Sequence, residues 1–410
     1  PGLQVQATFG SWAVRVRGLG SGITNLAFDS SVPVYIDGVY CGRGKCLESA
    51  FLDISRMEVA RGPQGALFGK STIAGAISVI SAPPTDEFEA QIKVGAELEN
   101  GGVATSGHIS GPLGDSLAGR LAFKYEEVDG FVDNPFVSDE EPEQESWGVR
   151  GTLRWDVTGT TDISLKVEAG DAETDGRTNQ LVAPGAMTSV SSDPNPEFRL
   201  DDVRRVSTGL PDEDFYDYEY SLATLTVNSQ VGDHTVTGIL GYWEYDNEWG
   251  LDVDGGPDAI LNTFLFDEYD QTTAEIRVLS PTDQTFEYIA GAWYQDSSLT
   301  TQQYSPFDPI FWDAVGVPDF VPRAPYPSGM DRNFERDSDA YSVYGQLTWN
   351  VSERFRAIFD VRYTDEEQDG TGWSYQAVFP DARNPEPWNG HPAPGFNANY
   401  RFDQTREDDS

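Results

Sequence analysis

Most of the chain after about residue 86 alternates apolar with polar side chains. In the stretch 117–126, for example, Leu121 and Phe123 fall on one face of an extended chain, whereas Arg120 and Lys124 fall on the other. A period of two residues is the pattern of a β-strand with one apolar and one polar face. The same analysis predicts eleven strands and a twelfth that opens near Asn399: 88–98, 103–112, 116–128, 145–157, 161–171, 215–230, 233–247, 267–280, 285–298, 336–350 and 354–367.

The connections between these strands alternate in length. Five are tight turns, at 111–115, 158–161, 231–233, 280–285 and 351–354, and between them lie connections at about 99–102, 129–144, 172–214, 248–266, 299–335 and 368–398. Compact soluble domains rarely hold several structureless loops beyond about 15 residues. Short turns at one end and long loops at the other are typical of outer-membrane barrels, whose apolar face meets lipid. The pattern therefore favours a barrel over a sandwich of two sheets.

Aromatic side chains gather near the predicted strand ends. Such a distribution suits the aromatic girdles that lie at the two membrane interfaces of a barrel. The girdle is predicted from Trp147, Trp155, Tyr216, Tyr218, Tyr242, Trp243, Tyr245, Trp293, Tyr294, Trp349 and Tyr363.

The composition narrows the function classes. Among 410 residues there are 27 Lys and Arg against 68 Asp and Glu, a formal net charge of −41, which excludes a nucleic-acid partner. An aromatic content of 12% argues against disorder, and no run of about 18 apolar residues exists to form a transmembrane helix. We interpret acidic runs in the long loops, such as 139–141 and 212–214, as solvated surface rather than calcium sites.

The first 85 residues have a different texture. Short β-rich runs at 32–39, 55–60 and 76–81 are separated by glycine-rich turns, among them Asp37-Gly38 and Gly62-Pro63, and Pro83-Pro84 then marks a break. Glycine supplies the positive φ of tight turns, and proline cannot donate to a strand ladder. This region is therefore predicted to be a small, tightly turned domain that precedes the long strands.

Five sequence blocks in this region carry a family resemblance. They are Val-Arg-Gly at 16–18, Val-Tyr-Ile-Asp-Gly-Val at 34–39, Met-Glu-Val-Ala-Arg-Gly-Pro at 57–63, Leu-Phe-Gly-Lys-Ser at 67–71 and Gly-Ala-Ile at 75–77. In this order and spacing they resemble the plug domain of TonB-dependent outer-membrane receptors. The resemblance implies a plug at 1–85 and the N-terminal part of a β-barrel at 86–410. The expected fold class is an all-β transmembrane barrel with an N-terminal α+β plug domain.

One further expectation concerns the completeness of the barrel. The family's barrel has 22 strands and about 12 are predicted here, and an open half-barrel would leave unpaired edges in lipid. Because the sequence also opens at Pro1 and ends at Ser410 without a signal peptide or a terminal aromatic strand, we expect a fragment truncated at both ends.

The resemblance also implies a ligand site at the plug apex. In these receptors the loop after the Tyr-Ile-Asp-Gly-Val strand faces the outer vestibule and touches the substrate. Here that loop offers Gly42, Arg43, Gly44 and Lys45, and its two cations would suit an anionic ligand such as a ferric siderophore; a solvated basic turn is the alternative. A second candidate apex contains Phe9 and Trp12, where a structural role is favoured.

Cys41 and Cys46 flank the first apex loop and are the two cysteines of the chain. They are expected to form a disulfide if the protein lies in an oxidising compartment, with two reduced thiols as the alternative. A zinc site is not expected, because His108, His234 and His391 are scattered along the sequence.

Other residues are assigned by the resemblance to a latch between plug and barrel. These are Arg17, Glu58 and Arg61, which lie in the matching blocks. The family also implies energy coupling through a TonB-ExbB-ExbD complex, whose contact segment is not in this sequence.

Catalytic chemistry is not indicated. The Gly-Lys-Ser triplet at 69–71 lacks the glycine that a phosphate-binding loop requires at position 64, where Gln64 stands. No histidine lies in a nucleophile or zinc context, so neither an enzyme nor a cofactor is expected.

The sequence therefore predicts TonB-dependent uptake of a scarce nutrient across the outer membrane of a Gram-negative bacterium, most plausibly a ferric siderophore. Cobalamin, haem and oligosaccharide remain alternatives. A secreted β-rich carbohydrate-binding protein is the rival from another class, and a surface receptor for signalling or adhesion is a third reading.

Overall fold

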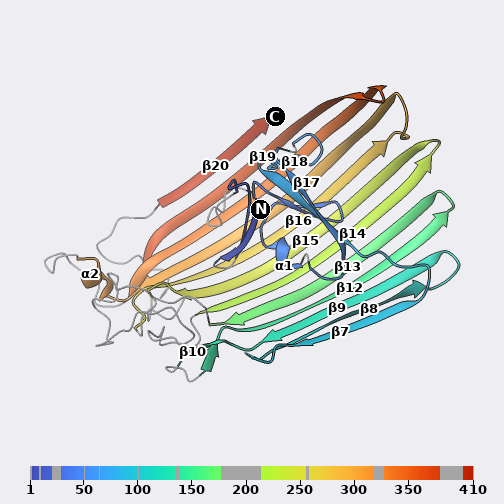
Figure 1. Cartoon of the computed structure of the whole chain (residues 1–410). Helices are drawn as coiled ribbons and strands as arrows, with labels where there is room; N and C mark the ends of the chain where they lie inside the picture. The colour runs from blue at the N-terminus through green and yellow to red at the C-terminus, as the bar shows by residue number, and fades with distance from the viewer. Residues whose placement is uncertain are drawn as a thin grey trace.

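A computed structural model describes residues 2–8, 11–20, 29–49, 51–63, 65–99, 101–134, 139–176, 214–254, 258–316, 327–378 and 400–409. Twelve antiparallel strands form one sheet, which runs from β7 at one edge to β20 at the other (Figure 1). They are β7 (Glu89–Ala96), β8 (Val103–Pro112), β9 (Leu117–Val128), β12 (Glu143–Thr158), β13 (Thr161–Asp175), β14 (Phe215–Val231), β15 (His234–Asp252), β16 (Asn262–Leu279), β17 (Phe286–Phe307), β18 (Ser328–Ser352), β19 (Phe355–Val378) and β20 (Tyr400–Asp409). We call this sheet the barrel wall.

The strand register gives the wall two chemically different faces. One row of paired residues includes Lys166, Thr224 and Thr273, all of which are buried. The neighbouring row includes Leu165, Leu240 and Tyr294, which are between 42% and 49% exposed. The predicted alternation is therefore confirmed, with the polar row facing the inside and the apolar row facing outward, as in a membrane barrel.

The strands extend further than the sequence indicates. All twelve lie at the predicted places, but β15, β16, β17, β18 and β19 continue into segments that were expected to be long loops, such as 299–335. A hairpin of β10 (Val132–Asn134) and β11 (Asp139–Glu141) and the short helix α2 (Phe311–Ala314) lie toward the same end of the wall (Figure 1). The short turns close the opposite end, and we call the two ends the loop end and the turn end.

The predicted aromatic girdle is only partly correct. Six of its members are exposed on the outer face: Trp147, Trp155, Tyr242, Tyr294, Trp349 and Tyr363. Four others, Tyr218, Trp243, Tyr245 and Trp293, are buried on the inner face, and Tyr216 lies beside a plug lysine. Period-two alternation alone does not say which face an aromatic residue takes, because these residues pack equally well against a plug.

The plug elements lie against one face of the wall (Figure 1). Four strands form its sheet in the order β4-β3-β6-β5, with β3 and β6 parallel. Their bounds are β3 (Val34–Ile36), β4 (Val39–Cys41), β5 (Ile54–Arg61) and β6 (Gly75–Ser81). A separate hairpin joins β1 (Leu3–Thr8) to β2 (Ser11–Val16), and α1 spans Cys46–Ser49.

A hydrophobic cluster joins the plug to the wall. Plug residues such as Val34, Ile36 and Ile77 belong to the same buried cluster as Tyr218 and Trp243 of the wall. Burial of apolar area, worth about 25 cal/mol per Å², therefore holds the plug in place together with the polar contacts described below. Within the described residues, no helix is long and apolar enough to cross a membrane.

Candidate functional site: the plug apex and the plug–wall contacts

The apex loop 42–45 lies toward the loop end of the wall. It follows β4 and leads into α1, and Lys45 contacts Tyr216 and Tyr218, which stand at the start of β14 directly after the connection 176–214. At the other end of the plug, Asp37 contacts Lys166, which lies five positions after the turn that opens β13. This loop therefore faces the end of the wall that carries the long connections.

Lys45 is enclosed by tyrosine rings. Its Nζ lies 5.2, 5.8 and 5.9 Å from the ring centroids of Tyr216, Tyr218 and Tyr245, within the range of cation–π attraction. The side chain is 4% exposed, and among the described residues Nζ has no hydrogen-bond acceptor. Burial lowers the pKa of Lys45 to about 8, although the carboxylates of Asp267 and Glu48 act in the opposite direction. In this structure the loop therefore turns Lys45 toward the wall rather than outward.

Arg43 and Gly44 are the partly exposed members of the loop. Burial lowers the pKa of Arg43, but the neighbouring Tyr245 and Asp267 outweigh it, so that the guanidinium keeps its charge more firmly than usual. The backbone turn is closed by Leu47 N donating to Gly44 O at 3.2 Å and Glu48 N donating to Lys45 O at 3.0 Å. The loop is thus a fixed, cationic surface rather than a solvated basic turn.

Cys41 and Cys46 are free thiols, which corrects the expected disulfide. Both are buried in the cluster that joins plug and wall, and burial together with the neighbouring Cys41 raises the pKa of the Cys46 thiol. Backbone hydrogen bonds and packing fix the turn between them, so the loop geometry does not depend on a covalent bond. Of the second candidate apex, Phe9 lies outside the described residues, and only the backbone of Trp12 is described, paired with Ala7.

A buried ion network links the plug to β18 and β19. Lys70 lies 3.2 Å from Asp29 and 2.8 Å from Glu366, and Arg336 lies 3.2 Å from Asp29. Burial raises the pKa of Asp29, but the two cations outweigh it and hold this pKa well below its usual range. Lys70, the lysine of the Gly-Lys-Ser triplet, is therefore committed to a contact between plug and wall.

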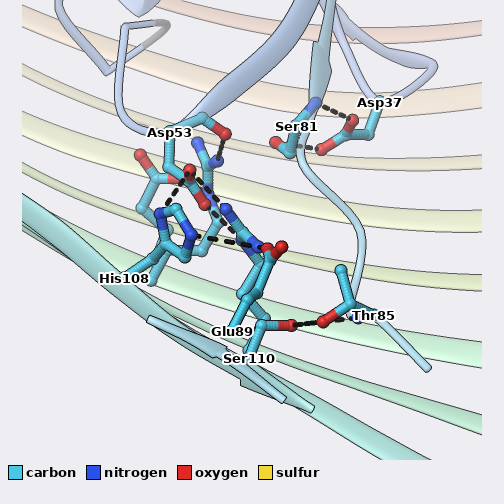
Figure 2. A network of polar contacts seen from close by, with 10 residues as sticks. Asp37, Asp53, Ser81, Thr85, Glu89, His108 and Ser110 are labelled. Carbon is cyan, nitrogen blue, oxygen red and sulfur yellow. Dashed lines mark hydrogen bonds and ion pairs between the residues drawn. The ribbon is translucent and has the colours of Figure 1, made fainter. Parts of the chain in front are cut away.

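A second group of contacts ties the plug to β7, β8 and β9. Arg120 donates from Nε and Nη2 to the two carboxylate oxygens of Asp53, at 2.6 and 2.8 Å, and from Nη1 to Glu89 at 2.7 Å. His108 lies 3.7 Å from Asp53 and 3.4 Å from Glu89, and Figure 2 shows these side chains converging. A bidentate arginine–carboxylate pair is both strong and directional. It fixes the position of the plug segment between α1 and β5.

Asp37 forms a third contact. It accepts hydrogen bonds from Ser81 N at 2.8 Å and from Ser81 Oγ at 2.7 Å, as Figure 2 shows, and it also pairs with Lys166 of β13. Burial raises the pKa of Asp37, but Lys166 and Ser81 together lower it below the usual value. In all three contacts an aspartate belongs to the plug and a cation to the wall.

The three contacts described above do not involve Arg17, Glu58 or Arg61, the residues that the resemblance assigns to a latch. Glu58 pairs with Arg56 inside the plug, and both side chains are 61% exposed. In the part of the chain that the structure describes, neither Arg17 nor Arg61 forms an ion pair, and both are exposed. Asp37 stands in a sequence block that the resemblance covers and Asp53 does not. Both adopt positive φ, which short polar residues tolerate, so a turn signal existed but nothing indicated their partners.

Comparisons with known proteins agree with this architecture. A family model described as the TonB-dependent receptor plug domain matches residues 1–76. The vitamin B12 transporter BtuB of Photobacterium profundum is 32% identical over 115 residues, which are 26% of this chain and 19% of the transporter. The pesticin receptor of Yersinia enterocolitica is 26% identical over 343 residues, or 83% of this chain and 45% of the receptor. The chain thus spans less than half the length of these curated relatives.

Two solved structures show the same fold. The ferric yersiniabactin uptake receptor FyuA from Yersinia pestis matches with a TM-score of 0.73 at 16% identity, over 100% of this chain and 56% of the receptor. The ferripyoverdine receptor of Pseudomonas aeruginosa matches with a TM-score of 0.66 at 16% identity, over 92% of this chain and 53% of the receptor. These relatives are receptors and transporters rather than enzymes. The N-terminal region is thus a TonB-dependent receptor plug domain, and the chain as a whole has the plug-and-barrel fold of the TonB-dependent receptors.

Proposed function

We propose that this chain supplies the plug and part of the barrel of an outer-membrane receptor that takes up a ferric siderophore by TonB-dependent transport. The observation that carries the proposal is a plug domain seated against the polar inner face of the wall, with a fixed cationic loop at the loop end. A boundary near residue 85 separates the two parts in this proposal, within the connection between β6 and β7.

The likeness to receptors for ferric yersiniabactin and ferripyoverdine supports a siderophore as ligand. Ferric siderophores are commonly anionic, and Arg43 with its raised pKa is a persistent positive charge at the plug surface. We propose that Arg43 and Gly44 contact the ligand from the plug side, whereas Gly42 is buried beneath them. Lys45 lies behind them, with its side chain packed among the tyrosines of the wall.

Cobalamin is the alternative that a specific observation favours. The match to BtuB falls at 32% identity, although over only 115 residues. Oligosaccharide ligands stack on exposed aromatic rings, and several aromatic residues lie in the half of the wall toward the loop end. Of these, Trp243 is buried against the plug, and Phe307, Phe311 and Trp312 pack on one another with centroids 4.8 to 5.5 Å apart. These rings therefore have few free faces for sugar stacking.

Transport requires the plug to move, and the three aspartate contacts define what must break. Energy from a TonB-ExbB-ExbD complex would be spent on these ion pairs and on the apolar cluster behind them. Buried ion pairs suit this role, because they give little net stability when formed but hold one geometry.

The test is uptake by cells that express the full-length gene, with and without a functional TonB. Iron-55 loaded siderophores of the hydroxamate and catecholate classes are compared with labelled cobalamin and maltooligosaccharides. TonB-dependent accumulation of iron is the expected result. Accumulation of cobalamin alone would replace the ligand, and a protein that is present in the outer membrane but takes up none of these compounds would overturn the transport proposal.

A further inference from the structure

A cavity lies between the plug and the wall on the turn side of the plug. Its volume is about 750 Å³, which is in the range of small-molecule sites. The plug contributes residues of β3, β5 and β6, among them Tyr35, and the wall contributes inward residues near the short turns, such as Asn228 and Thr235. The apex loop 42–45 is not part of its lining. This cavity is therefore distinct from the apex surface.

The charge of this cavity is opposite to that of the chain. Its lining includes five cations, Arg56, Arg154, Lys166, Arg277 and Arg362, against three anions, Asp37, Asp162 and Glu275. In the whole chain the acidic residues outnumber Lys and Arg by 68 to 27. Basic lining of this kind concentrates anions, because low-dielectric walls focus the field of the charges.

Most of these cations already have carboxylate partners. Lys166 pairs with Asp37, Arg56 with Glu58, Arg154 with Asp86, and Arg277 lies 3.8 Å from Glu275. Arg362 differs from them, because among the described residues it forms no ion pair. Its guanidinium donates to Ser342 Oγ at 2.8 Å and to Thr364 Oγ1 at 3.3 Å, both of which are neutral. Arg362 is therefore the cation of this lining that has no carboxylate within ion-pair distance in the described residues, although Asp162 of the lining also has no cation partner there and Glu275 acts on Arg362 from further away.

The position of Arg362 is fixed by aromatic rings and by the plug backbone. Its guanidinium carbon lies 5.7 Å from the ring centroid of Trp293 and 5.1 Å from that of Tyr344. A Cβ at Gly69 would come within 2.6 Å of the same atom, so glycine is needed there for the plug to approach. Arg362 also borders a second cavity of about 490 Å³, lined by Gly69 and Lys70. Arg362 therefore lies between the two cavities and lines both of them.

We propose that the 750 Å³ cavity is an anion-binding site for a carboxylate-bearing organic molecule, with Arg362 as the residue that binds the carboxylate. A planar guanidinium matches the two oxygens of a carboxylate, and the rings of Trp293 and Tyr344 hold this guanidinium in place by cation–π contact. The proposal goes beyond the apex site and does not depend on uptake. If uptake occurs, an anionic ligand would meet this site after it passes the apex.

The experiment measures benzoate binding to the purified full-length receptor in detergent by ligand-observed NMR titration, with benzamide as the neutral isostere. Charged hydrogen bonds correspond to roughly 10- to 100-fold in affinity. We expect Arg362→Gln to weaken benzoate binding by at least about tenfold and to leave benzamide unaffected, and Arg362→Lys to restore part of the affinity. Arg356→Gln is the matched control, because Arg356 is exposed on the same strand and does not line the cavity.

Several outcomes would overturn the proposal. They are the absence of benzoate binding to the unmodified receptor, equal binding of benzamide, or equal loss in the Arg362→Gln and Arg356→Gln variants. If Arg362→Gln receptors fail to assemble, Arg362→Lys takes their place, because it keeps the charge but loses the planar two-nitrogen fork, and unchanged benzoate affinity in that variant would also overturn the proposal. Because binding is measured on purified protein, failed uptake with intact benzoate binding would reject the transport proposal and keep this one.

Discussion

The contact between Asp37 and Lys166 offers the sharpest test of how the plug is held. Asp37→Asn removes the charge of the plug residue but keeps its size, and asparagine tolerates the positive φ of 51° at this position. The amide oxygen can still accept from Ser81. The change therefore leaves Lys166, which is 5% exposed, without its carboxylate partner.

The expected cost follows from this burial. Removing one partner of a fully buried ion pair costs about 3–5 kcal/mol, because the remaining charge is left uncompensated in a poorly solvated place. Asp37 is 20% exposed, so water can partly replace it, and we take about 3 kcal/mol, the low end of that range. At about 1.4 kcal/mol per factor of ten, this corresponds to a roughly 100-fold larger population of the undocked plug.

The two free cysteines provide the assay. Cys41 and Cys46 are buried in the cluster between plug and wall, so a maleimide reagent reaches them only when the plug opens. In reduced full-length receptor we expect Asp37→Asn to accelerate labelling about 100-fold, and the double variant Asp37→Asn/Lys166→Met to return it close to the unmodified rate. Labelling of Asp37→Asn at the unmodified rate, or equal rates for the single and double variants, would refute the reasoning.

The same contact has a pH dependence of known sign. The folded pKa of Asp37 is lowered below its ordinary value of 3.8, so the contact stabilises docking fully above that value. Its contribution disappears as the pH falls through the lower, folded pKa. Plug opening, measured by hydrogen exchange at β3 and β6, is expected to increase below about pH 4 in the unmodified receptor and to change less in Asp37→Asn.

Two further predictions concern residues whose roles differ from the sequence reading. The folded pKa of Lys45 is about 8 against an ordinary 10.5, so burying its charged form destabilises the fold below pH 8, and this cost fades as the pH rises to 10.5. Thermal denaturation should therefore show stability increasing between pH 8 and 10.5 in the unmodified receptor but not in Lys45→Met. Glu58→Gln and Arg61→Ala remove exposed charges that form no ion pair with the wall in the described residues, so both variants should label at Cys41 and Cys46 within about twofold of the unmodified rate. A much faster labelling rate in either variant would show that these residues do hold the plug to the wall.

Much of the wall could be predicted from the sequence. Period-two alternation is a local property, so Leu121, Phe123 and Arg120 took the faces that the pattern assigned. Strand ends at the turn side were also well placed, because glycine and proline mark tight turns. The ends at the loop side were not, since polar strands that rise above the apolar band carry no hydrophobic alternation, as in β18 from Ser328 onward.

The site was predicted less well, because its contacts join residues that are distant in sequence. Lys45 and Tyr216 are far apart in the chain, and so are Asp53 and Arg120. From the sequence alone a basic turn is expected to be exposed to solvent, whereas the fold places Lys45 among three tyrosines. The two cysteines are close in sequence and suggest a disulfide, yet packing and backbone hydrogen bonds already fix the turn.

By itself the sequence determined that this protein has two parts, a small glycine-turned plug and a wall of amphipathic strands, because each rests on turn chemistry and periodicity within short stretches. Only the tertiary structure decided which charges meet. Asp29, Asp37 and Asp53 look like ordinary polar residues until the wall brings Arg336, Lys166 and Arg120 to them. The docking of the plug sets these pairings, and no local pattern encodes the distance between residues that fold together from separate parts of the chain.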